Sequence, residues 1–186
     1  APKAPPAPPA PPAPPAAEWP VFPTCQVTTT AEAQALFMPM PGSLPVTRVG
    51  EGDRAFFRLP GNFRGTTHER CSWDIRIPAD LSVARGIQFL FYSADSNPVS
   101  HYSAYCHSGN GWYSGSVSVT RDGAWERLIL EKSRTNTEGE PAGWGAVDLL
   151  RISAWRARSD ADTAFGIAHI GPVGSDAAVL VLRADS

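Results

Sequence analysis

The sequence predicts an all-β protein, an antiparallel β-sandwich with one short helix near the N-terminus. Short apolar or alternating runs recur along the chain, and turn-forming residues separate them at regular intervals. The run Glu69 to Ile77 is the clearest, with Cys71, Trp73, Ile75 and Ile77 on one face and polar side chains between them. The only convincing helix signal is the pair Thr29 and Glu32, which has the spacing of a capping box.

Nine strands are expected, most of them ended by Gly, Pro, Asn or Asp. The helix that follows Thr29 should be two turns at most, because Pro39 and Pro41 stop it. A turn is expected at 108–111, a polar Gly-rich loop at 135–145, and a last strand at 177–182. The expected strands span 54–59, 69–77, 86–92, 101–106, 112–120, 125–131, 147–155, 164–170 and 177–182.

Composition divides the 186 residues into a linker and one domain. Residues 1–18 form an Ala/Pro-rich linker, since nine of the 19 Pro lie within the first 17 residues. Such a repeat favours extended polyproline II, so we expect a stiff spacer that does not pack on the domain; a ligand for a proline-recognition domain is the rival interpretation. Residues 19–183 suit a single domain, and 184–186 would begin a linker to a further domain.

Charge and hydropathy exclude two partner classes. The formal net charge is −2, with 16 basic against 18 acidic residues, which disfavours nucleic-acid binding because a basic surface is needed to displace counterions. The longest aliphatic run is far shorter than the roughly 20 residues that span a membrane. The expected partners are therefore neither nucleic acid nor membrane.

The order of motifs in the second half resembles that of galactose-binding-like jelly-roll modules of bacterial carbohydrate-active proteins. It runs from the strand at Trp125 through the Pro-Ala-Gly-Trp-Gly loop at Trp144 to the strands 147–156 and 163–170. The first half is compatible, with Ser-Trp-Asp at 72–74 and Gly-Asn-Gly-Trp-Tyr at 109–113. The resemblance implies a sandwich of eight or nine strands that binds glycans or spaces catalytic domains.

The same resemblance raises the question of a structural calcium ion. Such modules often draw one ligand from an acidic pair in the last-but-one strand, and the matching stretch here, 167–170, contains His169 and no carboxylate. Asp160 and Asp162 lie just upstream and would have to compensate. We therefore expect no cofactor, with calcium disfavoured.

Aromatic side chains are the candidate ligand-binding residues, because the apolar face of a sugar ring stacks on them. Trp73, Trp125 and Trp155 sit in strong strand patterns and are expected in the core. Rings beside Gly-rich turns, polar aromatics on one strand and an arginine in the loop 61–70 make up the candidate set: Trp112, Tyr113, Trp144, His101, Tyr102, Tyr105 and Arg64.

Metal and catalytic sites have weaker support. Cys71 and Cys106 would form a disulfide if their strands were neighbours, which is more plausible than a zinc site completed by His68 and His107. No nucleophile elbow, phosphate-binding loop or metalloprotease motif is present. The carboxylates Glu69, Asp74, Glu126 and Glu131 include no pair that the sequence marks as catalytic.

The preferred interpretation is a non-catalytic carbohydrate-binding or accessory module of a larger secreted bacterial protein, located outside the cell, on its surface or in the periplasm. Its partners would be a polysaccharide and the other domains of the parent chain. The alternatives are a structural interdomain module without a ligand and, less favoured, a polysaccharide-active enzyme such as a lyase.

Overall fold

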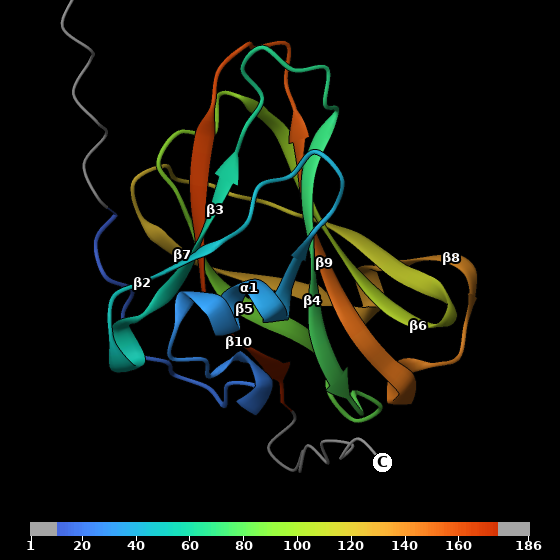
Figure 1. The fold of residues 1–186 in the computed structure, drawn as a ribbon. Coiled ribbons are helices and arrows are strands. Elements are labelled where there is room, and N and C mark those ends of the chain that lie inside the picture. The colour runs from blue at the N-terminus through green and yellow to red at the C-terminus, as the bar shows by residue number, and fades with distance from the viewer. Residues whose placement is uncertain (1–10, 175–186) are drawn as a thin grey trace, which may run out of the picture.

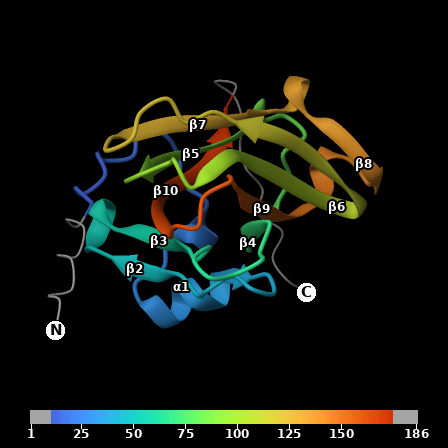
Figure 2. The same cartoon turned by 90° about the horizontal axis from the view of Figure 1, so that it is seen from above.

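The computed structural model describes residues 11–174, which form two five-stranded antiparallel sheets packed face to face (Figures 1 and 2). Sheet A has the strand order β1-β4-β9-β6-β8, and sheet B has the order β2-β3-β10-β5-β7. The antiparallel β-sandwich expected from the sequence is therefore the fold of this chain. The strands are β1 (Phe37–Pro39), β2 (Thr47–Val49), β3 (Phe56–Gly61), β4 (Arg70–Ala79), β5 (Gly86–Ser93), β6 (Val99–Val117), β7 (Trp125–Glu131), β8 (Asn136–Pro141), β9 (Val147–Arg156) and β10 (Thr163–Val173).

The one α-helix within the described residues, α1 (Thr30–Leu36), begins at the predicted capping box. The Glu32 backbone N–H donates to the Thr29 hydroxyl at 3.1 Å, and the Glu32 carboxylate accepts from the Thr29 backbone N–H at 2.9 Å. Four short 3₁₀ turns complete the elements: η1 (Pro23–Cys25), η2 (Gly52–Arg54), η3 (Lys132–Arg134) and η4 (Trp144–Ala146). Among residues 11–174 no helix has the length and apolarity needed to cross a bilayer.

The core lies between the two sheets and has Trp73 near its centre. The Trp73 side chain is fully buried, its ring meets Phe165 edge to face at 5.6 Å, and its indole N–H donates to the Leu44 carbonyl at 2.8 Å. The alternation predicted for 71–77 is confirmed, because Cys71, Ile75 and Ile77 are fully buried beside it.

The region 108–141 differs from the prediction. The stretch 108–111, expected as a turn, lies inside the 19-residue strand β6, and the expected loop 135–145 contains β8, which pairs with it. The reason is steric: a Cβ at Gly111 would stand 2.4 Å from the Glu138 carbonyl oxygen, so glycine lets the two strands approach rather than turn. Figures 1 and 2 show this β6–β8 pair at one end of the molecule.

The N-terminal segment also differs from expectation. Residues 11–18, expected to be a spacer free of the domain, lie against sheet B, where the Pro12 carbonyl accepts a hydrogen bond from the Trp125 indole. The segment contacts the Trp125 and His169 rings of that sheet, and the local sequence does not reveal this contact. The strand expected at 177–182 lies outside the described residues.

Candidate ligand-binding face

The outer face of sheet A carries rings and charged groups in register across β4, β9 and β6. Because Trp73, Leu150 and Ala104 point into the core, their chain neighbours point outward. We call the outward set the polar aromatic face; it consists of Arg70, Ser72, Asp74 and Arg76 of β4, Leu149, Arg151, Ser153 and Trp155 of β9, and His101, Ser103, Tyr105, His107 and Trp112 of β6.

At one end of this face, Trp155 stands between two flat side chains. The His101 ring is stacked on it, with centroids 5.4 Å apart and planes 9° from parallel, and the Arg70 guanidinium lies 4.9 Å from the ring centroid. The Trp155 indole N–H donates to the Ser103 hydroxyl at 2.8 Å, which fixes the ring's orientation. A cavity of about 340 Å³ opens beside His101 and Trp155, with the loop residues 67–69 on its far side.

Small hydroxyl side chains occupy the next row along the strands. Ser72 and Ser153 are buried and share a hydrogen bond of 2.7 Å, and Ser103 donates to the Tyr105 hydroxyl at 3.2 Å. These hydrogen bonds satisfy the buried hydroxyls. The serines are small, so this row is lower than the Trp155 row and the Arg151 row on either side of it.

The third row is centred on Arg151. Its Nε and Nη2 donate to the two carboxylate oxygens of Asp74 at 2.6 and 2.9 Å, a bidentate pair whose side chains are only 20% and 17% exposed. The same guanidinium lies 4.3 Å from the centroid of the Trp112 ring. Tyr105 and His107 meet that ring edge-on, at 6.3 and 4.7 Å. Arg151 is therefore held on two sides, and Trp112 is held with it.

Three of the predicted site residues, His101, Tyr105 and Trp112, lie together on the polar aromatic face. Trp155, which the sequence pattern assigned to the core, lies there as well and is half-buried. The pattern misled because Leu149 and Leu150 are consecutive apolar residues, and only the register shows that Leu150, Ile152 and Ala154 point inward.

Tyr102 does not lie on this face. Its side chain points into the core, 3% exposed, and packs against Phe91 and Phe165 at 4.9 and 5.7 Å. Burial raises the pKa of its hydroxyl to about 12. Since neighbours on a strand face opposite ways, the outward direction of His101 requires the inward direction of Tyr102.

Within residues 11–174, the other three candidates form no ring stack or hydrogen bond with the rings of this face. Tyr113 follows Trp112 on β6 and turns the other way, where it stacks on Trp144 at 4.1 Å and both pack against the core. Arg64 lies in an exposed loop, and its backbone N–H donates to the Asp162 carboxylate at 2.8 Å. These residues remain predictions as ligand contacts.

Sequence reasoning missed Arg151 as a site residue, and it considered Asp74 only among the carboxylates that include no marked catalytic pair. A signal did exist: each is a charged residue at an outward position of a strand whose alternate residues are apolar and buried. What the sequence did not contain is the pairing of β4 with β9, which sets Asp74 directly opposite Arg151.

The candidate metal sites are not assembled in residues 11–174, where no group of three or more His, Cys, Asp or Glu side chains is placed to hold an ion. Asp160 and Asp162, the expected substitutes for a calcium ligand, instead accept hydrogen bonds from Gly65 and Arg64 backbone N–H groups. Cys71 and Cys106 are both free, because β9 lies between their strands.

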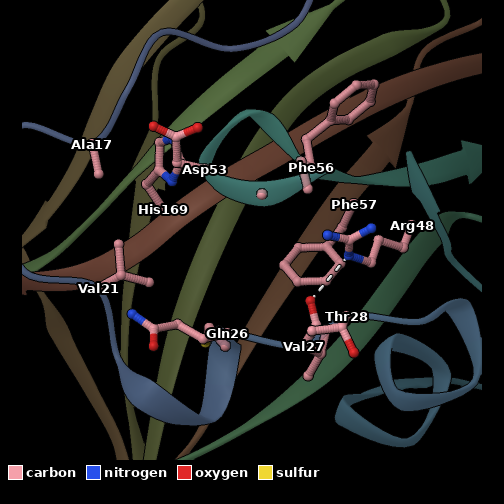
Figure 3. A pocket seen from close by; sticks show the side chains of 13 residues that line it. Ala17, Val21, Gln26, Val27, Thr28, Arg48, Asp53, Phe56, Phe57 and His169 are labelled. Atoms are coloured by element: carbon pink, nitrogen blue, oxygen red, sulfur yellow. Dashed lines mark hydrogen bonds between the residues drawn. The ribbon is translucent and has the colours of Figure 1, made fainter. Parts of the chain in front are cut away.

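A second cavity, of about 400 Å³, lies on the other side of the molecule between the N-terminal segment and β3 (Figure 3). It is lined mainly by apolar groups such as Val21, Phe56 and Phe57. Its one arginine, Arg48, donates to the carbonyls of Val27 and Gly50 at 3.0 and 2.7 Å. None of the predicted site residues lines it.

No protein-family model matches this sequence, and no curated protein matches it. Solved structures do match. A family 11 carbohydrate-binding module from Clostridium thermocellum, solved with a β-1,3-1,4-mixed-linked tetrasaccharide, superposes with a TM-score of 0.57 at 14% identity, over 75% of this chain and 88% of the module.

Two further matches extend this picture. A family 30 carbohydrate-binding module superposes with a TM-score of 0.50 at 12% identity, over 77% of this chain and 80% of that module. An agarase matches with a TM-score of 0.54 at 12% identity, over 84% of this chain and 26% of the agarase. Identities of this size report on fold alone. In fold, therefore, this chain is a jelly-roll β-sandwich like those of carbohydrate-binding modules.

Proposed function

We propose that this protein is a non-catalytic carbohydrate-binding module that binds a polysaccharide on the polar aromatic face of sheet A. The observation that carries the proposal is the ordered set of rings and planar charges there, above all Trp112 held by Arg151 and Trp155 held by His101 and Arg70. A sugar presents apolar C–H patches and hydroxyl groups at once, and a face of rings beside Arg, Asp and His groups is complementary to both.

The organisation of the face suits an extended chain. The row of Trp155 and the row of Arg151 are four residue steps apart on β9, about 13 Å at the rise of a strand. A single sugar ring would engage one row, whereas an oligosaccharide along the face would engage both. The fold relatives include modules of this type, one of them bound to a mixed-linked tetrasaccharide.

Binding should be weak. A face of this kind buries little area, and each sugar hydroxyl must exchange water for a protein partner. We expect dissociation constants on the order of 0.1–1 mM, or about −4 to −5.5 kcal/mol. Because Trp112, Trp155 and Arg151 are already held by neighbours, little side-chain entropy is lost on binding.

The test is affinity electrophoresis and calorimetry of the full chain with mixed-linked β-1,3-1,4-glucan, agarose and an acidic polysaccharide. Trp112→Ala should weaken binding at least tenfold, since it removes the ring that Arg151 holds. A matched pair of variants on β6 separates the two faces: Tyr105→Phe should weaken binding, and Tyr113→Phe should leave it unchanged. If the wild type binds none of the three polysaccharides, or if binding survives both Trp112→Ala and Trp155→Ala, the proposal is wrong.

The placement of three of the four candidate carboxylates supports the non-catalytic role. Asp74 is committed to Arg151, and Glu131 and Glu126 lie on β7 of the other sheet, the former paired with Arg85 and the latter hydrogen-bonded by Thr120. Prolonged incubation with a bound polysaccharide should release no new reducing or unsaturated ends. Release of either would favour a glycosidase or a lyase.

We further propose that the module works within a larger bacterial protein outside the cytoplasm. A binding module acts by holding the domains attached to it close to a polysaccharide. The Ala/Pro-rich segment has the composition of an interdomain spacer. Fractionation of cells that produce the parent protein should recover it in the medium, the periplasm or at the surface.

A further inference from the structure

The N-terminal Ala/Pro segment is held on the outer face of sheet B by side chains that act as hydrogen-bond donors to its backbone. The Trp125 indole N–H donates to the Pro12 carbonyl at 2.8 Å, and the His169 ring Nε2 lies 2.9 Å from the Pro15 carbonyl oxygen. Pro14, between them, is buried. Pro has no N–H of its own, so at each Pro the carbonyl is the only backbone group that can form a hydrogen bond.

The surface under the segment is a small apolar cluster separate from the main core. Phe56, Leu90 and Ala168 form it, on three adjacent strands of sheet B, and Trp125 packs over them. The Trp125 ring meets Phe56 at 5.3 Å and Tyr92 at 5.4 Å. Gly166 makes this arrangement possible, since a Cβ there would stand 2.8 Å from the Trp125 ring.

His169 adopts an unfavourable backbone conformation at the position where its ring contacts Pro15. It is the only non-glycine residue with positive φ, +56°, within the described part of the chain, and it sits at the irregularity between Ala168 and Gly171 in β10. The bulge turns its carbonyl toward the Trp19 indole N–H, at 2.7 Å, while its ring reaches Pro15. One strained residue thus contacts the segment at Pro15 and the start of the domain at Trp19.

The spacing of these contacts matches the repeat of the segment. Pro12 and Pro15 are three residues apart, and polyproline II has three residues per turn, so their carbonyls lie on one side of such a helix. The sequence repeats Ala-Pro-Pro with the same period from Ala4 to Pro15. Aromatic surfaces with an indole donor aimed at a carbonyl are how proline-rich segments are bound, because a stiff segment loses little entropy on docking.

We propose that the outer face of sheet B is a binding site for Ala/Pro-rich polyproline II segments, and that this chain's own residues 11–17 are its resident ligand. The site consists of Trp125, His169, Tyr92 and Phe56, and it lies on the sheet opposite the polar aromatic face. Docking removes seven residues, about 20 Å of extended chain, from the free length of the spacer. A domain attached ahead of this segment would be held beside sheet B instead of swinging from Trp19.

The experiment uses the full chain and follows the Trp125 indole N–H by NMR, assigned by its loss in Trp125→Phe. A segment variant, with Pro11→Ser, Pro12→Gly, Pro14→Ser and Pro15→Gly, should raise hydrogen exchange at this indole about fivefold or more. An added peptide of three Ala-Pro-Pro repeats should then shift the resonance saturably in the segment variant. In the unaltered chain, where the site is occupied, the same peptide should leave the resonance in place.

Two controls keep the outcome decisive. His169→Asn keeps a residue that tolerates positive φ but removes the ring donor, so it should also raise indole exchange and should weaken peptide binding. A Gly-Ser peptide of equal length should shift nothing. Unchanged indole exchange in the segment variant, or no saturable shift with the Ala-Pro-Pro peptide, would overturn the proposal.

Glycan binding is the independent readout. The segment variant and His169→Asn leave sheet A unaltered, so they should bind the polysaccharide panel as the wild type does. Failure of the glycan-binding proposal and failure of the segment-binding proposal are therefore observed in different experiments.

Discussion

The guanidinium of Arg151 lies 4.3 Å from the centre of the Trp112 ring while two of its nitrogens hold the carboxylate of Asp74. Arg151 and Asp74 face each other across β9 and β4, whereas Trp112 comes from the far part of β6. One side chain thus joins three strands on the outer face of sheet A. Substitution of Arg151, Asp74 or Trp112 should therefore disturb the positions of the other two side chains.

A coupled stability effect is expected at this pair. Arg151→Met leaves Asp74 mostly buried without its charge partner and should cost about 1–3 kcal/mol of unfolding free energy. Adding Asp74→Asn should recover part of that loss, because the unpaired charge is gone. Urea denaturation of the two single variants and the double variant measures the coupling. Additive losses would show that the two side chains do not stabilise each other.

The close pairing of β6 with β8 predicts that position 111 accommodates glycine but no residue with a Cβ atom. A Cβ at Gly111 would lie 2.4 Å from the Glu138 carbonyl oxygen and 2.5 Å from the Pro141 nitrogen, both of them backbone atoms. Gly111→Ala should therefore separate the strands, cost about 1–3 kcal/mol, and weaken glycan binding by moving the adjacent Trp112. Gly174→Ala is the matched control, since no atom of residues 11–174 is found within 4 Å of that Cβ. Equal melting temperatures for both variants would contradict the predicted clash.

The capping box of α1 should make part of the stability depend on pH. Hydrogen bonds from the Thr28 backbone and hydroxyl and from the Thr29 backbone lower the pKa of Glu32 below its ordinary value of 4.5. A carboxyl with a lowered pKa in the folded state stabilises the fold above pH 4.5, and the contribution is lost as the pH falls through the folded-state pKa.

Glu32→Gln is the variant that tests this, because glutamine can still accept the backbone hydrogen bond of a capping box but does not titrate. The wild type should melt above this variant at pH 6, and the gap should close between pH 4.5 and the folded-state pKa. Thermal melts of both proteins across this range measure the gap. A difference that is constant with pH would mean that the ionised Glu32 contributes nothing.

All three cysteines should be unreactive in the folded protein. Burial raises the pKa of the Cys25 and Cys106 thiols to about 12 and raises that of Cys71 as well, and the thiolate is the reactive form. Ellman's reagent at pH 8 should detect no thiol without denaturant, and all three should react in guanidinium without added reductant. A single reactive thiol under those conditions would reveal a disulfide.

The sequence by itself determined the fold class and much of the in-and-out pattern. Alternation over 71–77 placed Trp73 in the core, and the capping box at Thr29 placed the start of α1, because both signals depend on residues a few positions apart. The same local reasoning placed His101, Tyr105 and Trp112 among the candidate binding residues. Those properties follow from side-chain chemistry and the period of a strand.

Only the tertiary structure decided which residues act together. Asp74 and Arg151 are 77 positions apart, and strand pairing makes them partners. Gly111 was expected in a turn because local propensity cannot reveal that β8 approaches it closely enough to require glycine. Pro12 and Pro15 were expected to be free of the domain. They contact Trp125 and His169, which lie more than a hundred positions further along the chain. Contacts between distant residues depend on the packing of whole sheets, and no short stretch of sequence contains that information.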